Sequence, residues 1–165
     1  MIELRPIKSE DIAEIKKWPP YADGFEQMDY ALREGGWLDE FRDKPDTCIY
    51  AVMVDGRLSG FSLLSPDSAQ EAEFRIAVHP SRTGKGLGKE ITLATLEKGY
   101  LELDFSRIHL IVRKNNPRAS KLYRSIGFTP TGESIHTIGG KEIEFIDMVM
   151  TKKQFDNLER KENKQ

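Results

Sequence analysis

The chain contains little cysteine and no long apolar run. Cys48 is the single cysteine among 165 residues, which excludes an internal disulfide framework and a zinc site built on cysteines. It lies in the apolar stretch 48–52, where a small buried side chain is favoured over a nucleophile. Since no run of about 18 apolar residues exists, we expect no membrane-spanning segment.

An excess of charge of one sign and a leader pattern are also absent. The formal net charge is −2, so non-specific nucleic-acid binding is not expected as the main activity. Residues 1–11 lack a basic region followed by an apolar stretch, so no secretory signal is expected. The 38% hydrophobic and 32% charged content is typical of a globular protein. We expect one cytoplasmic domain over 1–165, whose polar C-terminal tail, 152–165, frays after one or two helical turns.

Hydrophobic periodicity predicts a mixed α/β fold. Asp55-Gly56 and Gly139-Gly140 are hairpin turn signals, and Asn116-Pro117 is a helix start. The apolar run 108–112 indicates a strand covered on both faces. A long helix over 86–103 carries a broad apolar stripe that includes Tyr100, Leu101 and Leu103. The expected strands are 2–7, 49–54, 57–64, 71–78, 108–112, 128–138 and 141–150, with further helices from Ser9, within 23–41 and over 116–126.

A glycine-rich, basic turn follows the strand 71–78. Its segment Gly84–Lys89 lacks the Ser or Thr that a P-loop needs after Gly-Lys, and Lys89 stands where the dinucleotide fingerprint needs glycine. Backbone N–H groups without Cβ atoms at a helix start, near Arg82, Lys85 and Lys89, favour an anion such as a pyrophosphate. An ordinary strand-to-helix loop is the alternative.

Two motifs here resemble those of the GCN5-related N-acetyltransferase (GNAT) superfamily. Val78-x-Pro80, followed by Gly84–Gly88 (GKGLG), is similar to the acetyl-CoA pyrophosphate loop of that family. Asn116-x-x-Ala119-x-x-Leu122-Tyr123-x-x-x-Gly127-Phe128 is similar to the helix that follows later in the family. The motifs stand in the family's order with a strand between them, and they span roughly residues 71–130. Together they are much more specific than either one alone.

The resemblance implies a fold, a reaction and a co-substrate. The fold is a mixed, mostly antiparallel central sheet of about seven strands flanked by helices, formed by a single N-acetyltransferase domain. The reaction moves an acetyl group from acetyl-CoA, without a metal, to a primary amine by direct attack. The acceptor is a small molecule, such as a polyamine or an antibiotic, or a protein N-terminus. Dimers are common in the family, so a homodimer is one expected assembly.

The resemblance also assigns residues to the coenzyme. Main-chain groups of the strand contact the pantetheine arm, and one of its N–H groups lies near the thioester oxygen. The family usually has Gln or Arg where this chain has Thr83, so a side-chain contact to phosphate is missing here or comes from Arg82. The expected coenzyme-binding residues are Ile76, Ala77, Val78, Arg82, Thr83, Gly84, Lys85, Gly86, Leu87, Gly88, Lys89 and Asn116, the last of which is also an expected helix N-cap.

Tyr123 and Glu73 are the candidates for acid–base chemistry. The resemblance directs the Tyr123 hydroxyl toward the coenzyme sulfur, where a phenol can protonate a leaving thiolate. The alternative is a core residue, since Tyr123 shares an apolar helix face with Ile126. Strand alternation places Glu73 and Arg75 on one face, so Glu73 is either the general base or part of a surface ion pair. His109, in an apolar strand, is more typical of a structural residue.

The acceptor amine is expected to meet residues 21–41 and the hairpin at Gly139-Gly140. Acidic side chains in the first segment attract a cationic amine or simply solubilise the surface. Two other functions compete with acetyl transfer: a non-catalytic acyl-CoA-binding module, and a nucleoside-triphosphate enzyme that the failed P-loop pattern disfavours. The acidic side chains of the segment 21–41, to which the amine attraction refers, are Asp23, Glu26, Asp29, Glu34, Asp39 and Glu40.

Overall fold

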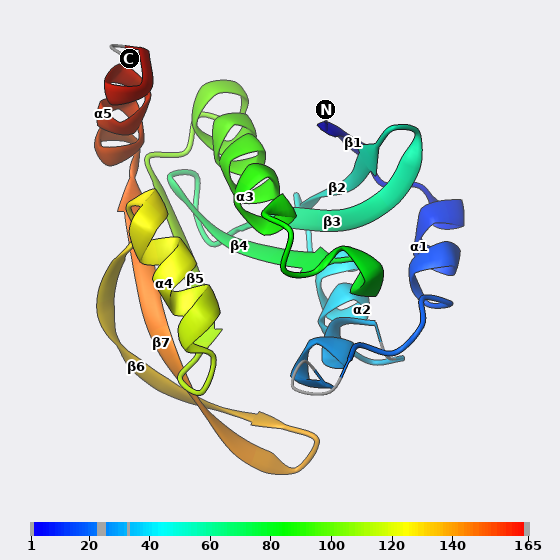
Figure 1. Ribbon diagram of the computed structural model, residues 1–165. Helices are drawn as coiled ribbons and strands as arrows, with labels where there is room; N and C mark the ends of the chain where they lie inside the picture. Colours follow the sequence, from blue (N-terminus) through cyan, green and yellow to red (C-terminus); the bar gives the residue numbers. More distant parts are fainter. Residues whose placement is uncertain (1, 23–25, 33, 164–165) are drawn as a thin grey trace. The chain divides into compact units, whose positions relative to one another are not determined.

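A computed structural model describes residues 2–22, 26–32 and 34–163. Its strands form one seven-stranded sheet in the order β1-β2-β3-β4-β5-β7-β6, drawn in Figure 1. The pair β4–β5 is parallel, whereas β1–β2, β2–β3, β5–β7 and β6–β7 are antiparallel, which confirms the predicted fold class. The strands are β1 (Ile2–Pro6), β2 (Cys48–Val54), β3 (Arg57–Pro66), β4 (Glu71–Val78), β5 (Arg107–Arg113), β6 (Thr129–Ile138) and β7 (Lys141–Thr151).

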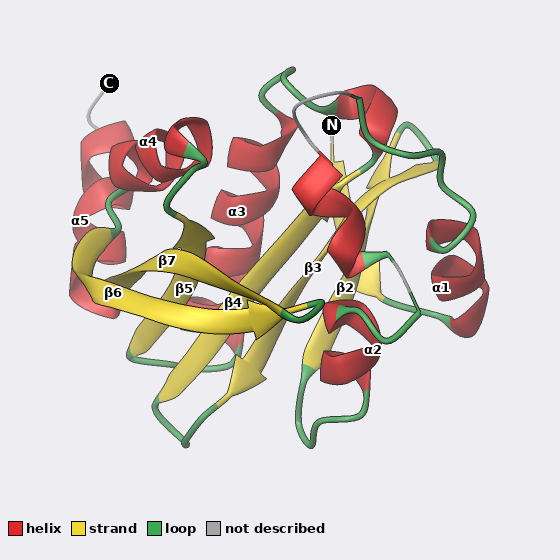
Figure 2. Ribbon diagram, turned by 90° about the horizontal axis from the view of Figure 1, so that it is seen from below, coloured by secondary structure: helices red, strands yellow, loops and turns green. Residues whose placement is uncertain are grey.

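Helices follow β1, β4, β5 and β7 along the chain, and Figure 2 distinguishes them from the strands by colour. Both predicted hairpin turns are confirmed, because φ is positive at Asp55, Gly56, Gly139 and Gly140. The α-helices are α1 (Ser9–Ile15), α2 (Trp37–Arg42), α3 (Leu87–Glu97), α4 (Pro117–Ile126) and α5 (Lys152–Asn163). The remaining turns are η1 (Glu26–Ala31) and η2 (Pro80–Arg82), both 3-10 helical, and η3 (Lys98–Glu102), which is π-helical.

The contacts group the chain into two compact units. The first unit comprises 1–66 and 74–95, and the second comprises 67–73 and 96–165. The strand β4 therefore contributes its first three residues to the second unit and the rest to the first. One domain over 1–165 stays a prediction.

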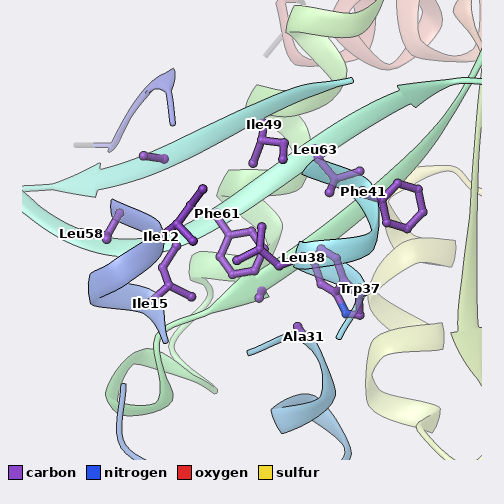
Figure 3. Close-up of a cluster of buried hydrophobic side chains, with 12 residues drawn as sticks. Ile12, Ile15, Ala31, Trp37, Leu38, Phe41, Ile49, Leu58, Phe61 and Leu63 are labelled. Atoms are coloured by element: carbon purple, nitrogen blue, oxygen red, sulfur yellow. The ribbon is translucent and has the colours of Figure 1, made fainter. Parts of the chain in front are cut away.

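The sheet of the first unit is covered on both faces. On one face Ile49, Phe61 and Leu63 pack with residues of α1 and α2, as Figure 3 shows. On the other face Val52 and Val78 pack with the start of α3. Successive strand residues point to opposite faces, so this part of the chain buries almost every position of β2 and β3.

The second unit buries one face of its strands. Ile108, Leu110 and Val112 are buried, whereas His109 and Ile111 between them are half-buried. The buried face meets the helices of this unit: the Tyr100 hydroxyl donates to the Met150 carbonyl oxygen at 2.7 Å. The strand β5, expected to be covered on both faces, thus has one buried face and one half-buried face.

Two helical predictions are also wrong in detail. The stripe expected through Leu101 and Leu103 fails, because the helix widens into the π-helical turn η3 and leaves these side chains 55% and 37% exposed. The C-terminal tail does not fray after two turns. It forms α5, of 12 residues, whose Phe155 is 2% exposed and packs on Tyr100 with a ring-centroid distance of 5.1 Å.

Candidate functional site

The glycine turn of the first unit joins β4 to α3 through η2. Gly84 and Gly86 have φ angles of +77° and +83°, a region that favours glycine. A Cβ atom built on Gly86 would meet nothing within 4 Å, so the turn is open at that point. The helix α3 begins at Leu87, and its first N–H groups have no acceptor within the helix. Open amides at a helix start are the arrangement that binds anions.

The side chains of this turn divide into one that holds the turn and three that supply charge. The Thr83 hydroxyl donates to the Pro80 carbonyl oxygen at 3.2 Å, so this side chain stabilises the turn. Arg82 is half-buried, while Lys85 and Lys89 are exposed. Within 2–22, 26–32 and 34–163, none of these three cations forms an ion pair with a carboxylate. Their charge therefore remains available to an anion.

The end of β4 is fixed by contacts that the sequence did not indicate. The buried Tyr21 hydroxyl donates to the Val78 carbonyl oxygen at 2.6 Å, and the His79 N–H donates to the Ser59 carbonyl oxygen at 2.8 Å. Burial also raises the pKa of Tyr21. A Cβ on Gly60 of β3 would lie 2.9 Å from the Ala77 carbonyl oxygen. A glycine inside a strand signals such a close backbone approach, so Gly60 could have been found from sequence.

In the second unit, Asn116 caps the start of α4 and Tyr123 lies within that helix. Asn116 Oδ1 accepts from the Ala119 N–H at 3.2 Å, which confirms the predicted N-cap, and Gly127 ends the helix with a φ of +127°. The half-buried Tyr123 ring meets Phe128 edge to face with centroids 5.9 Å apart. Burial raises the pKa of Tyr123 to about 12. The phenol is therefore protonated at neutral pH, the state that a general acid needs.

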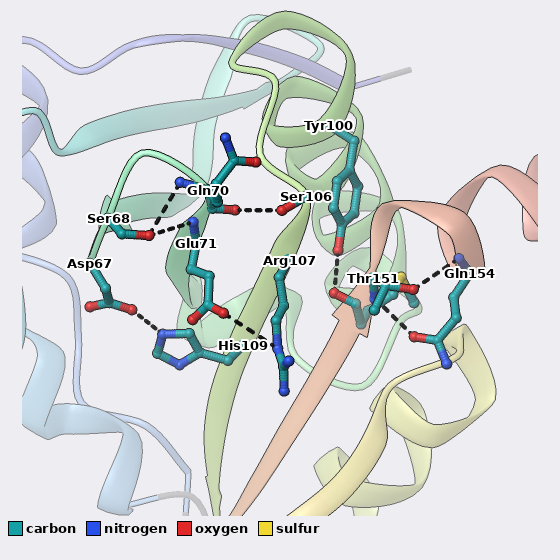
Figure 4. A network of polar contacts seen from close by, with 11 residues as sticks. Asp67, Ser68, Gln70, Glu71, Tyr100, Ser106, Arg107, His109, Thr151 and Gln154 are labelled. Atoms are coloured by element: carbon teal, nitrogen blue, oxygen red, sulfur yellow. Dashed lines mark hydrogen bonds and ion pairs between the residues drawn. The ribbon is translucent and has the colours of Figure 1, made fainter.

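Glu73 lies on the half-buried face of the second unit's strands. The parallel register of β4 and β5 pairs Glu73 with His109, so the two residues are direct neighbours on one face. His109 Nε2 contacts Asp67 Oδ2, as Figure 4 shows. Asp67 lies in the turn between β3 and β4, where no alternation pattern identifies it.

Arg75 contacts aromatic rings in the first unit. It is the residue that would pair with Glu73 if Glu73 formed a surface ion pair instead of acting as the general base. Its guanidinium carbon lies 5.0 Å from the centroid of the Phe41 ring and 5.7 Å from that of Trp37. Both rings belong to α2, so the Arg75 side chain covers an aromatic surface.

Several acidic side chains of the predicted acceptor segment are bound within the first unit. Asp39 accepts from Lys16 Nζ at 2.9 Å, a hydrogen bond that lowers the pKa of Asp39. Asp29 accepts from the Tyr21 N–H at 3.3 Å. Asp23 and the side chain of Glu26 lie outside the described residues. For Asp39 and Asp29 these bonds favour a structural role over amine attraction.

Other predicted features concern metals, membranes and thiols. Over the described ranges, no group of three or more His, Cys, Asp or Glu side chains could hold a metal ion. Over the same ranges, no helix has the length and apolar character needed to cross a membrane. The half-buried Cys48 Sγ lies 4.0 Å from the Asp46 carbonyl oxygen.

Known sequences match this chain along most of its length. Residues 10–128 match the model of the Acetyltransferase (GNAT) family. A spermidine N(1)-acetyltransferase of Escherichia coli is 28% identical over 93% of this chain and 88% of its own. A mycothiol acetyltransferase of Clavibacter sepedonicus is 34% identical over 56% of this chain, but over only 28% of its own length.

Solved structures share the fold. The crystal structure of spermidine N-acetyltransferase from Vibrio cholerae in complex with CoA and spermine has a TM-score of 0.78 and 21% identity. The match covers 94% of this chain and 98% of that chain. The dodecameric structure of the same enzyme in an intermediate state gives a TM-score of 0.73 at 20% identity. At this identity the likeness establishes the fold.

Proposed function

Because the chain belongs to the acetyltransferase (GNAT) family, we propose that it transfers an acetyl group from acetyl-CoA to a primary amine of a polyamine. The observation that carries the proposal is the glycine turn with its positive φ angles at the start of α3. The acceptor class rests on the spermidine acetyltransferases with which the chain aligns over most of its length. The chain 1–165 acts as one catalytic domain in this proposal.

The first unit binds the donor. The amide N–H groups from Gly84 to Lys89 donate hydrogen bonds to the pyrophosphate of CoA, while Arg82, Lys85 and Lys89 add positive charge. Main-chain groups of Ile76–Val78 contact the pantetheine arm. Because the Val78 carbonyl oxygen already accepts from Tyr21, we assign these contacts chiefly to the other main-chain groups of the strand. Asn116 of the second unit remains a candidate coenzyme ligand through its side-chain N–H groups, since its oxygen caps α4.

The second unit supplies the acid and the base. Glu73 accepts a proton from the substrate ammonium, which leaves the amine nitrogen with the lone pair that attacks the thioester carbon. As the tetrahedral intermediate collapses, the C–S bond breaks and the Tyr123 hydroxyl donates a hydrogen bond and then its proton to the thiolate. The second proton that the nitrogen loses as it becomes an amide returns to the Tyr123 phenolate, so the net product of the cycle is the one proton held by Glu73. The pKa of about 12 keeps Tyr123 protonated throughout the neutral range.

An acceptor screen tests this function. The purified chain is incubated with acetyl-CoA and, separately, spermidine, spermine, an aminoglycoside or a peptide with a free N-terminus, and CoA thiol release is followed. We expect amine-dependent release that is fastest with spermidine or spermine, and mass spectrometry should detect the acetylated amine. Binding of CoA without turnover on any amine would instead identify a non-catalytic acyl-CoA-binding module.

Assembly and location belong to the same proposal. The Vibrio cholerae enzyme that shares the fold is dodecameric in one structure, so we expect an oligomer, a homodimer at least. Light scattering on the eluting protein measures the mass of the assembly. A cytoplasmic location would give the enzyme both acetyl-CoA and polyamines, and fractionation of cells tests it.

A further inference from the structure

A turn with its own hydrogen bonds positions Asp67. The Asp67 N–H donates to the Glu71 carbonyl oxygen at 2.9 Å, and Ser68 Oγ accepts from the Gln70 and Glu71 N–H groups at 3.2 Å each. Ser106, just before β5, donates its N–H to the Gln70 carbonyl oxygen at 2.9 Å. Figure 4 shows this turn beside β5. Four backbone and side-chain contacts thus fix a turn that would otherwise be a mobile surface loop.

The fixed turn directs the Asp67 carboxylate to His109. The contact joins Asp67 Oδ2 to His109 Nε2, which leaves Nδ1 as the other proton-carrying position of the ring. The side chains are 33% exposed for His109 and 51% exposed for Asp67, so both reach solvent. In the register of the strands, His109 stands beside Glu73. His109 therefore has the water-facing Asp67 carboxylate at one ring nitrogen and the proposed general base at the paired position of the neighbouring strand.

The charged groups around His109 are known from each neighbouring strand. Glu71 and Glu73 lie on β4, and Arg107 lies two residues earlier on β5, 3.7 Å from Glu71 measured from Nε to Oε1. On β7 the residue opposite His109 is Val149, and Asp147 is two positions along. Asp67 completes the set from the turn. Carboxylates thus predominate among the charged groups near His109.

We propose that His109, held by Asp67, passes the ammonium proton from Glu73 to solvent. The inference rests on the proposed function, in which Glu73 is the base. In the first step the substrate ammonium loses a proton to the Glu73 carboxylate. In the second step the neutral imidazole takes that proton, so Glu73 becomes a carboxylate again and His109 becomes an imidazolium stabilised by Asp67. The imidazolium then releases the proton to water, and the pair returns to its starting state.

His109 and Asp67 act through Glu73 and are positioning residues rather than catalytic ones. Their effect therefore lies in the rate of proton removal, and coenzyme binding is untouched. The contribution is largest where the amine arrives fully protonated and vanishes where the solution already holds free amine. This dependence separates a proton path from a structural contact.

The test compares wild type with His109→Gln, Asp67→Asn and the control Glu71→Gln. The control removes the ion pair to Arg107 from the same two strands without touching His109. We expect His109→Gln to lower kcat about tenfold near pH 7, to recover toward pH 9 and to leave the Kd for CoA unchanged. Added imidazole should restore part of the rate of His109→Ala. Asp67→Asn should lower kcat near pH 7 in the same direction and recover likewise toward pH 9, because His109 loses the carboxylate that holds its ring.

Other outcomes separate this inference from the proposed function. Suppose that wild type acetylates spermidine and Glu73→Gln does not, while His109→Gln keeps the wild-type rate and pH profile. The proton path through His109 is then wrong, and the assignment of Glu73 as the base is retained. A loss in His109→Gln that is equal at every pH, and that imidazole does not restore, would also overturn it. If Glu73→Gln is fully active, the base assignment itself fails. Thermal unfolding and CoA titration identify a variant that does not fold. If His109→Gln is such a variant, the kinetics of Asp67→Asn test the proton path in its place.

Discussion

The candidate functional groups of the first unit belong to the main chain, whereas those of the second unit are side chains. In the first unit the glycine turn, the proposed coenzyme site, offers main-chain amides, shaped by the positive φ angles of Gly84 and Gly86. In the second unit the candidates are side chains, Tyr123 on α4 and Glu73 beside His109. A main-chain site is damaged by adding atoms, whereas a side-chain site is damaged by removing one functional group. Substitutions in the two units should therefore change different kinetic constants.

The largest expected effect is on the chemistry of the second unit. Tyr123→Phe should lower kcat by about 100-fold or more, because the thiolate leaves without its proton donor. The Kd for CoA should stay within error of wild type in a calorimetric titration. Because the pKa of Tyr123 is raised to about 12, wild-type kcat should show no alkaline loss from this residue up to about pH 11. Equal kcat in the variant would return Tyr123 to the role of a core residue.

Side-chain packing should also dominate the stability of the second unit. Phe155→Ala removes a ring that is 2% exposed and lies against Tyr100, so we expect a loss of about 3–5 kcal/mol in the free energy of unfolding. Leu101→Ala is the matched control, since that side chain is 55% exposed and should change the free energy by about 0.5 kcal/mol or less. Urea unfolding measures both. If Phe155→Ala and Leu101→Ala lost similar free energies of unfolding, the exposure of Leu101 in η3 would be contradicted.

In the first unit, adding a single carbon atom to Gly60 should be enough to destabilise the fold and weaken CoA binding. Gly60→Ala places a Cβ 2.9 Å from the Ala77 carbonyl oxygen, and we expect a destabilisation of about 1–3 kcal/mol with weaker binding of CoA. Gly132→Ala on β6 is the control, because its Cβ would lie 4.0 Å from the nearest Asp147 oxygen. Thermal unfolding with and without CoA compares them. If Gly60→Ala bound CoA as tightly as wild type, CoA binding would not depend on the close approach of Gly60 to Ala77 of β4.

The smallest effect concerns an ion pair in the first unit that is distant in sequence from the glycine turn. Arg5 donates to Asp11 at 2.7 and 2.9 Å, and this bonding lowers the pKa of Asp11. A lowered pKa stabilises the fold above the ordinary value of 3.8, and this stabilisation is lost as the pH falls through the folded-state value. Arg5→Gln should therefore cost about 1–2 kcal/mol at pH 7 and progressively less in acid. Urea titrations at several pH values test the trend, and a cost that persists at pH 2 would contradict it.

Most of the fold and the conformation of the glycine turn could be predicted because local patterns encode them. The strands, both hairpin turns and the N-cap at Asn116 follow from periodicity, glycine placement and capping chemistry. The packing of α5 could not be predicted, because Phe155 meets Tyr100 from a distant part of the chain. The exposure of Leu101 depends on a π-helical turn that no residue type announces.

The candidate site divides in the same way. Gly84 and Gly86 are visible in the sequence because only glycine readily adopts their conformation. Tyr21 and Asp67 were missed, since each makes its contact across many residues, to Val78 and to His109. Glu73 was found by alternation, but its neighbour His109 required the register between β4 and β5. Long-range register is what local periodicity leaves undetermined.

The most direct test of the glycine turn is a calorimetric titration of CoA into wild type, Gly86→Val and Tyr123→Phe. A β-branched residue at a φ of +83° is strained and places carbon where the phosphates would approach the amides. We predict tight binding to wild type and to Tyr123→Phe, and binding weaker by about tenfold or more to Gly86→Val. Equal affinity in all three proteins, or no binding of CoA to wild type, would contradict the assignment of the glycine turn as the coenzyme site.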